Sequence, residues 1–192
     1  MLKDLFVSDV RLKILELLLT RPEKQFHVRA IVRAVDAEIN AVRRELFKLH
    51  NMGLLRKRQS GNRIYYKVDP ANIYYSELLA LVAKEQGIGG LLIRNAKDLG
   101  EIKFAVLSKT FLKGRKSSVL DVDLLIVGSV DLEVLKRLVS LAEKEHEREI
   151  NYTVMSEEDF TFRKRKSDHF VTKILSQGRT MLIGDEEEFC AL

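Results

Sequence analysis

Apolar residues recur at every third or fourth position in three stretches of the first fifty residues. This spacing places them on one face of an α-helix. It predicts a helix between Ser8 and Pro22, a second helix over 28–35, and a third helix that begins at Ile39 and ends at Gly53. Ser8 is a good N-cap, Pro22 cannot continue a helix, and Gly53 suits the left-handed position after one.

The spacing of the apolar residues changes after the third helix. Two strand-like runs, 54–59 and 63–68, flank the residues 60–62, which include a glycine. This pattern predicts a β-hairpin, and a further short strand is expected over 25–27. Three helices followed by a hairpin is the order of elements in a winged helix-turn-helix, so the first part of the chain is expected to be a domain of that kind.

The rest of the chain alternates between strands and helices, which predicts α/β layers around a small mixed sheet and an α+β protein as a whole. The stretch 87–90 is rich in glycine and is expected to be a hinge. The expected domains are a winged helix-turn-helix over 1–70, a linker helix and hinge over 71–90, and an α/β domain over 91–192. Strands are expected over 103–107, 119–127, 150–155 and 180–183, and helices over 73–83, 91–99, 132–145, the residues after Ser156, and 169–177.

The composition is typical of a globular protein in water. Of the 192 residues, 46% are hydrophobic and 32% are charged, and no apolar run is long enough to cross a bilayer. The first residues lack the pattern of a signal peptide, so a cytoplasmic location without membrane contact is expected. The single cysteine, Cys190, excludes an internal disulfide and a cysteine-rich zinc site.

Positive charge is concentrated in the first part of the chain. Residues 1–70 hold 15 Lys and Arg against 8 Asp and Glu, whereas the remainder is slightly acidic. This bias is typical of a domain that binds a polyanion. Arginine and asparagine can read guanine and adenine in the major groove, and cations on a hairpin can contact phosphates. The residues expected to contact double-stranded DNA are Asn40, Arg43, Arg44 and Lys48 on the third helix, and Arg56, Arg58 and Arg63 on the hairpin, with Lys67 as a further cation there. For any one of these residues, the alternative is a solvated surface charge.

The stretches 40–46, 52–55, 61–63 and 65–66, together with Leu49, resemble the corresponding parts of ArsR-type winged-helix regulators. This resemblance implies a transcription regulator that binds double-stranded DNA, in many members as a homodimer. The cysteines by which some members sense metals are absent, which argues against a metalloid sensor.

Asp121 and Asp123 are the one group of residues whose spacing indicates a reaction at phosphate. Alternate residues of a strand point to the same face, so both carboxylates would project together from the expected strand over 119–127. Paired in this way they could hold one Mg²⁺, the ion that fixes a triphosphate for phosphoryl or nucleotidyl transfer. The alternative is that both aspartates are solvated or ion-paired, and that they serve the fold without binding a metal.

The stretch 108–127 resembles the core of the minimal nucleotidyltransferases, which have a DNA polymerase β-like fold. The resemblance implies Asp121 and Asp123 as metal ligands and Ser108 as a contact to a nucleoside triphosphate. The chain departs from the family where Leu107 replaces the glycine of a Gly-Ser motif, and where Asn151 stands in place of a third carboxylate. Further stretches that resemble the family are 148–151, 156–160, 168–170 and 182–184.

These departures favour a degenerate transferase fold that senses a nucleotide or mediates assembly. The leading hypothesis is therefore a DNA-binding transcription regulator with such a second domain. One alternative is an active Mg²⁺-dependent nucleotidyltransferase that modifies a protein or an RNA. The other is an antitoxin-like module that acts through contacts with another protein.

Overall fold

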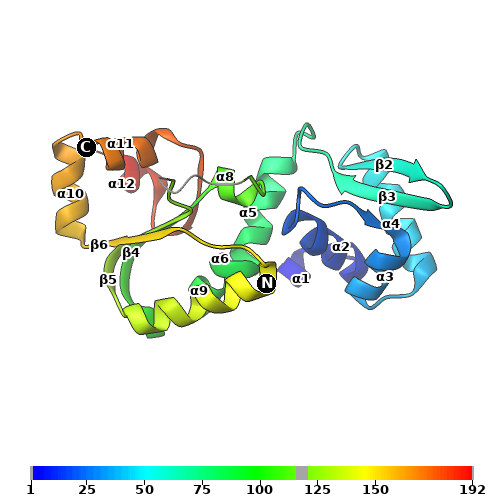
Figure 1. The fold of residues 1–192 in the computed structure, drawn as a ribbon, viewed down its shortest axis with the longest axis horizontal. Coiled ribbons are helices and arrows are strands. Elements are labelled where there is room, and N and C mark those ends of the chain that lie inside the picture. Colours follow the sequence, from blue (N-terminus) through cyan, green and yellow to red (C-terminus); the bar gives the residue numbers. More distant parts are fainter. Residues whose placement is uncertain (1, 116–120, 192) are drawn as a thin grey trace. The chain divides into compact units, whose positions relative to one another are not determined.

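The structure is a computed structural model, in which residues 2–115 and 121–191 are described (Figure 1). The chain divides into two compact units, Met1–Gln86 and Gly87–Leu192. The described residues form twelve helices and two sheets. The protein is therefore α+β, as the sequence predicts.

Helices make up most of the first unit. The three helices expected in the first fifty residues are present as α2, α3 and α4. The side chain of Ser8 caps α2, with its Oγ accepting the backbone N–H of Arg11 at 3.2 Å. Asp36 follows α3 in the left-handed conformation, with a φ of 47°, and the chain turns there into α4. The helices of this unit are α1 Leu2–Leu5, α2 Asp9–Leu19, α3 Val28–Val35, α4 Ile39–Asn51 and α5 Tyr75–Glu85.

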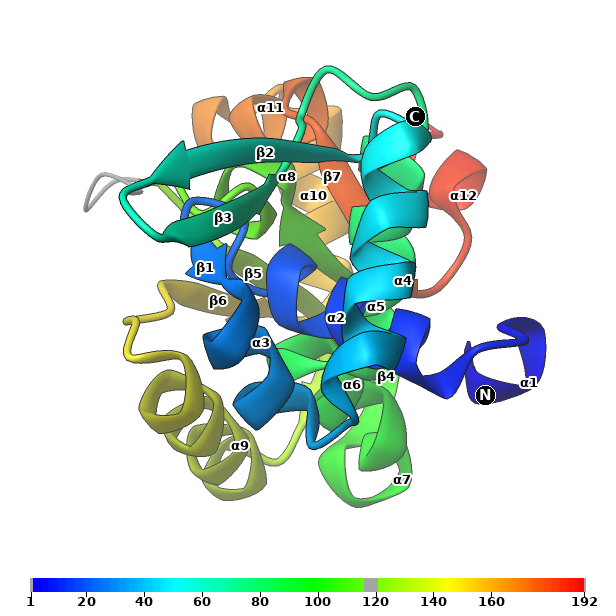
Figure 2. The same cartoon turned by 90° about the vertical axis from the view of Figure 1, so that its right-hand side faces the viewer.

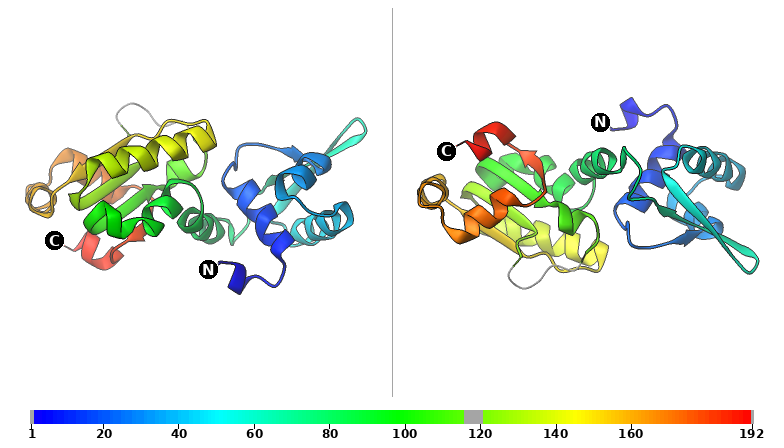
Figure 3. Two further views of the ribbon diagram at one scale, coloured as in Figure 1. Left: turned by 90° about the horizontal axis from the view of Figure 1, so that it is seen from below. Right: turned by 90° about the horizontal axis from the view of Figure 1, so that it is seen from above.

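A three-stranded antiparallel sheet completes the first unit. Its strands are β1 Phe26–His27, β2 Leu55–Ser60 and β3 Arg63–Val68, in the order β1-β3-β2. β2 and β3 form the expected hairpin, and Gly61 in its turn has a φ of 56°, a conformation that favours glycine. The tip of the hairpin projects beyond the helices of its own unit (Figure 1, Figure 3). In Figure 2, α4 lies in front of α2.

The glycine-rich stretch 87–90 is helical and begins where the second unit begins, so its role as a hinge stays a prediction. These residues form the first turn of α6 Gly87–Arg94, in which Ile88, Gly89 and Gly90 are buried. α6 packs against α9 Leu132–His146. Glycine has a low helix propensity, but tertiary packing overrides propensity where it buries the helix.

A four-stranded mixed sheet forms the centre of the second unit. β5 runs parallel to β6 and antiparallel to β4, and β4 runs antiparallel to β7. The mixed sheet that the sequence predicts is therefore present, in the order β6-β5-β4-β7. Its strands are β4 Gly100–Ser108, β5 Leu124–Val130, β6 Tyr152–Met155 and β7 Arg179–Ile183. The remaining helices of this unit are α7 Ala96–Leu99, α8 Lys109–Leu112, α10 Glu157–Arg165, α11 His169–Ser176 and α12 Glu186–Cys190.

The strand expected over 119–127 begins later than the sequence predicts. Residues 119 and 120 lie outside the described residues, and β5 starts only at Leu124. The backbone N–H groups of Asp123 and Leu124 both donate to the carbonyl oxygen of Asn151, at 2.8 and 3.2 Å, next to the start of β6. Asp121 and Asp123 therefore precede the strand, and the alternation expected to bring their carboxylates to one face does not apply.

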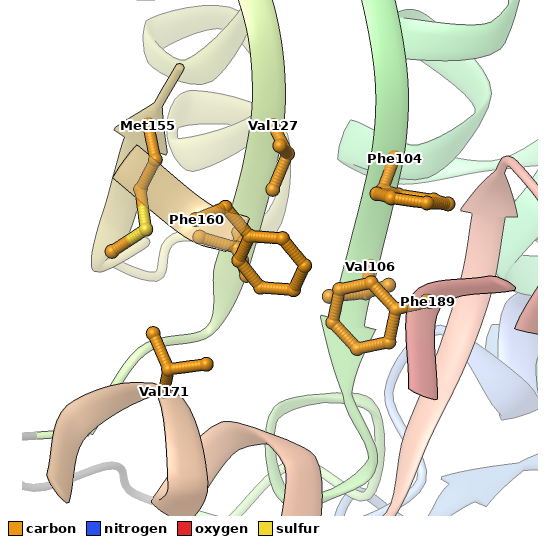
Figure 4. Close-up of a cluster of buried hydrophobic side chains, with 8 residues drawn as sticks. Phe104, Val106, Val127, Met155, Phe160, Val171 and Phe189 are labelled. Carbon is orange, nitrogen blue, oxygen red and sulfur yellow. The ribbon is translucent and has the colours of Figure 1, made fainter. Parts of the chain in front are cut away.

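Aromatic side chains from distant parts of the chain form the core on one face of the second sheet (Figure 4). Phe160 of α10 and Phe189 of α12 stack with their ring centroids 5.2 Å apart. Phe104 of β4 meets Phe189 edge to face at 5.3 Å. Val127, Met155 and Val171 lie in the same cluster, so this core joins β4, β5 and β6 of the sheet to α10, α11 and α12.

Candidate functional site

The helix α4 starts at a well-defined position because an acidic side chain caps it. The carboxylate of Glu38 accepts the backbone N–H of Ala41 at 2.9 Å. Hydrogen bonds from the backbone N–H groups of Asn40 and Ala41 hold the pKa of Glu38 below its usual range. The first turn of α4, which carries Asn40, is therefore anchored at its N-terminus.

The inner face of α4 is held by apolar packing and by ion pairs to one buried carboxylate. Val42, Leu46 and Leu49 are buried in the core of the first unit. Between them, Glu45 is only 8% exposed and its carboxylate lies 2.6 Å from Nε of Arg11 in α2 and 3.3 Å from Nζ of Lys48. Lys48, one of the expected DNA contacts, therefore has part of its charge neutralised within the protein.

We expect these ion pairs to make the stability of the first unit dependent on pH. Burial raises the pKa of Glu45, but hydrogen bonds and positive charge from Arg11 and Lys48 outweigh it, so its pKa lies below the ordinary 4.5. A depressed pKa gives stability that is present above the ordinary value and is lost as the pH falls through the folded-state value. Glu45→Gln should lower the free energy of unfolding by about 1–2 kcal/mol at pH 7. It should also make the free energy of unfolding decrease less as the pH is lowered into acid.

Urea unfolding followed by circular dichroism, repeated from neutral pH into acid, measures this effect. Glu77→Gln is a matched control, because it removes one negative charge from an exposed position on α5. An unchanged pH profile in Glu45→Gln, or an equal change in Glu77→Gln, would contradict the assignment.

The outer face of α4 carries the polar residues that the sequence assigns to base contacts. Asn40, Arg43 and Arg44 are all exposed there. Arg43 and Arg44 follow Asn40 by three and four residues, so all three share one side of the helix. The structure thus brings these three candidates together on a surface from which arginine and asparagine can reach a ligand.

The register of the hairpin places Arg56, Arg58, Arg63 and Lys67 on one face, whereas Lys57 projects to the other. In the antiparallel pairing, Arg56 lies opposite Lys67, Arg58 opposite Tyr65, and Ser60 opposite Arg63. Residues opposite each other across such a pair project to the same side. The other face carries Leu55 and Val68, which are buried. The face opposite these buried residues, the outer face, is therefore basic and contains all three expected DNA contacts of the hairpin.

Two aromatic side chains on this outer face were not among the expected contacts. The rings of His27 and Tyr65 meet edge to face, with centroids 5.8 Å apart. Nδ1 of His27 accepts the backbone N–H of Ala30 at 3.2 Å and so caps α3. The alternation of β3 places Tyr65 beside Arg63 and Lys67, but the pairing of His27 with it depends on β1 and cannot be read from local sequence.

One hairpin cation is held by the protein itself. The guanidinium of Arg56 lies 2.8 Å from the carboxylate of Asp69. The hydrogen bond from Arg56, together with the backbone N–H of Ala71, holds the pKa of Asp69 below its usual range. Arg58 and Arg63 are exposed, which makes them stronger candidates for an external anion than Arg56.

In the second unit, Ser108 and Asp123 lie next to each other. The backbone N–H of Ser108 donates to the carbonyl oxygen of Asp123 at 2.8 Å. The Ser108 hydroxyl oxygen accepts the backbone N–H of Thr110 at 3.1 Å and caps the short helix α8. Both residues line a small pocket of about 10 Å³ that also contains Arg179. A pocket of this size holds about one water molecule.

The two aspartates are engaged in different ways. Asp123 is 2% exposed, and its carboxylate accepts the backbone N–H of Asn151 at 3.0 Å. The carboxylate of Asp121 lies 2.8 Å from Nζ of Lys173 in α11. Asp121 and Asn151 line an open hollow of about 490 Å³, of which Phe170 forms another wall. Asp121 and Asp123 thus line different pockets.

These residues do not fit a preformed Mg²⁺ site. A lysine ammonium at 2.8 Å from Asp121 occupies a position where its positive charge would repel a divalent cation. Asp123 is almost fully buried, and the third position of the expected site is Asn151. Within residues 2–115 and 121–191, no group of three or more His, Cys, Asp and Glu side chains is placed to hold a metal ion.

Comparisons with protein-family models, with curated proteins and with solved structures found no match to this chain. No helix in the described part of the chain combines the length and the apolar character needed to cross a membrane.

Proposed function

We propose that this protein is a transcription regulator that binds double-stranded DNA through its first unit, which acts as a winged helix-turn-helix. The observation that carries the proposal is the outward placement of exposed cations on two elements. Arg43 and Arg44 lie on the outer face of α4, and Arg58 and Arg63 lie on the outer face of the β2–β3 hairpin, next to the half-buried Lys67. In this proposal α4 is the recognition helix and the hairpin is the wing.

The dimensions and chemistry of α4 suit the major groove. An α-helix with its side chains is about 10–12 Å wide, and the major groove of B-DNA is about 12 Å wide. Arginine can donate two hydrogen bonds to O6 and N7 of guanine, and asparagine can pair with N6 and N7 of adenine. Arg43, Arg44 and Asn40 are therefore proposed to read bases, whereas Lys48, which is held by Glu45, would contribute mainly charge.

The hairpin suits contact with the phosphate backbone. A row of arginine and lysine side chains on one face of a projecting hairpin can follow a strand of phosphates without reading sequence. The Tyr65 hydroxyl adds a hydrogen-bond donor to this face. Regulators with this plan commonly bind two half-sites as dimers, and we propose that this protein acts on DNA as a homodimer.

For the second unit we propose a nucleotidyltransferase-like domain that acts in sensing or assembly rather than in catalysis. Two contacts support this view over an active enzyme. The Asp121 carboxylate is paired with Lys173, and the Asp123 carboxylate is buried against the backbone of Asn151. An active transferase would need these groups to be open to a metal-bound triphosphate.

The salt dependence of binding tests the proposed role of the hairpin. Each phosphate contact that is lost should reduce the slope of log affinity against log salt concentration by about one. We expect Arg58→Ala to weaken binding to a labelled random-sequence duplex and to reduce this slope by about one. Fluorescence anisotropy at several salt concentrations measures both quantities for the full chain.

Lys97→Ala is the matched control, since Lys97 is exposed on α7 of the second unit. It removes one positive charge without altering the hairpin, so its slope should equal that of the unmodified protein. A wild-type protein that binds no duplex even at low salt would overturn the proposed function itself.

A further inference from the structure

An apolar side chain stands in the middle of the polar outer face of α4. Phe47 is 63% exposed, although it lies in the middle of a helix whose opposite face is packed into the core. It follows Arg43 by four residues and Arg44 by three, and it precedes Asn51 by four. Residues at these spacings are neighbours on a helix surface. Phe47 therefore neighbours Arg43 and Arg44, two of the side chains proposed to read bases.

The surroundings of Phe47 indicate the kind of partner that would cover it. Covering an exposed phenylalanine removes apolar surface from water, so the ring offers binding energy to whatever covers it. An apolar protein surface placed on Phe47 would also have to desolvate the guanidinium groups of Arg43 and Arg44, which is costly without acidic partners. DNA supplies negative charge for the two arginines and an apolar group for the ring at the same time.

We propose, on the basis of the DNA-binding function above, that Phe47 is a specificity-determining residue that recognises thymine. The major groove displays one apolar group, the C5-methyl of thymine, and phenylalanine is among the side chains that contact it. A helix rises about 1.5 Å per residue, so Phe47 lies about 6 Å along α4 from Arg43. With about 3.4 Å between base pairs, the thymine should lie within about two base pairs of the base read by Arg43.

Removal of the thymine methyl group tests this contact directly. The full chain would first be used to select its preferred duplex from a random-sequence library. Each thymine of that duplex would then be replaced in turn by deoxyuridine, which lacks only the methyl group. Burying one such carbon is worth about 0.8 kcal/mol, so one replacement should lower the affinity of the wild-type protein about fourfold.

The variant Phe47→Ala links that effect to the side chain. It should bind the selected duplex about tenfold more weakly than wild type and should not distinguish thymine from deoxyuridine at the sensitive position. Met52→Ala is the matched control, because Met52 is 60% exposed just after the same helix. Met52→Ala should lose affinity on replacement of thymine by deoxyuridine to the same extent as wild type. Circular dichroism should show that both variants are folded.

The outcomes separate this inference from the proposed function. If the wild-type protein selects no duplex, the proposed function fails and the inference fails with it. If it selects a duplex that has no thymine near the contacts of α4, or if Phe47→Ala keeps the wild-type response to deoxyuridine, the thymine contact alone is overturned. Loss of the response in Phe47→Ala and its retention in Met52→Ala would support the contact.

Discussion

Replacement of both Arg43 and Arg44 by alanine is expected to lower the affinity for the selected duplex by about 10²- to 10⁴-fold. Each bidentate contact between an arginine and a guanine contributes about 1–3 kcal/mol of discrimination. Both side chains are exposed on the outer face of α4, so the change removes contacts with the ligand and little packing. Affinity for random-sequence DNA should fall much less, because contacts with phosphates dominate that binding.

The control for this experiment must remove the same charge from a comparable helix. Lys136 and Arg137 are adjacent exposed cations on α9 of the second unit, and their replacement by alanine also lowers the net charge by two. We expect this double variant to bind within about twofold of wild type, because long-range charge is screened at physiological salt. Anisotropy titrations would refute the role of α4 if the two double variants lost affinity equally.

The largest effect on stability is expected from Phe189→Ala in α12. Phe189 is fully buried, and its ring contacts those of Phe160 and Phe104 at centroid distances of 5.2 and 5.3 Å. Arg179 also lies over the ring, at 5.3 Å. Truncating a buried phenylalanine to alanine costs about 3–5 kcal/mol, since it loses apolar burial and leaves a cavity. Urea unfolding monitored by circular dichroism should show this loss.

A second phenylalanine of the same unit provides the comparison. Phe162 lies in α10, two residues after Phe160, but it is 61% exposed. Phe162→Ala should change the free energy of unfolding by less than about 0.5 kcal/mol. Similar losses in the two variants would show that the aromatic cluster does not stabilise the second unit as proposed.

The elements that depend on local patterns could be predicted from the sequence. The helix over 28–35 is found with those bounds, and the hairpin turns at Gly61 as expected, because capping, periodicity and turn residues act over a few positions. The start of β5 could not be predicted in this way, since it depends on pairing with Asn151. The glycines at 87–90 indicate flexibility by composition, yet their packing makes them helical.

The same distinction applies to the candidate site. The exposed stripe of Asn40, Arg43 and Arg44 follows from the helical period alone. The ion pairs that change the availability of charged groups do not, because their partners are distant in sequence. Arg11 and Glu45 are 34 residues apart, and Asp121 and Lys173 are 52 apart. Without a fold there is no reason to pair them, so Asp121 looks more accessible in the sequence than it is in the structure.

The order of strands in the second sheet affects how this unit can be synthesised. β4 pairs with β5 on one side and with β7, the last strand of the sheet to be made, on the other. On the ribosome, one edge of β4 therefore stays unpaired until α9, β6, α10 and α11 have been synthesised. Open edges of this kind recruit other strands, and such distant pairings form slowly. We expect nascent chains paused before Arg179 to be the species most prone to aggregation and most in need of a chaperone.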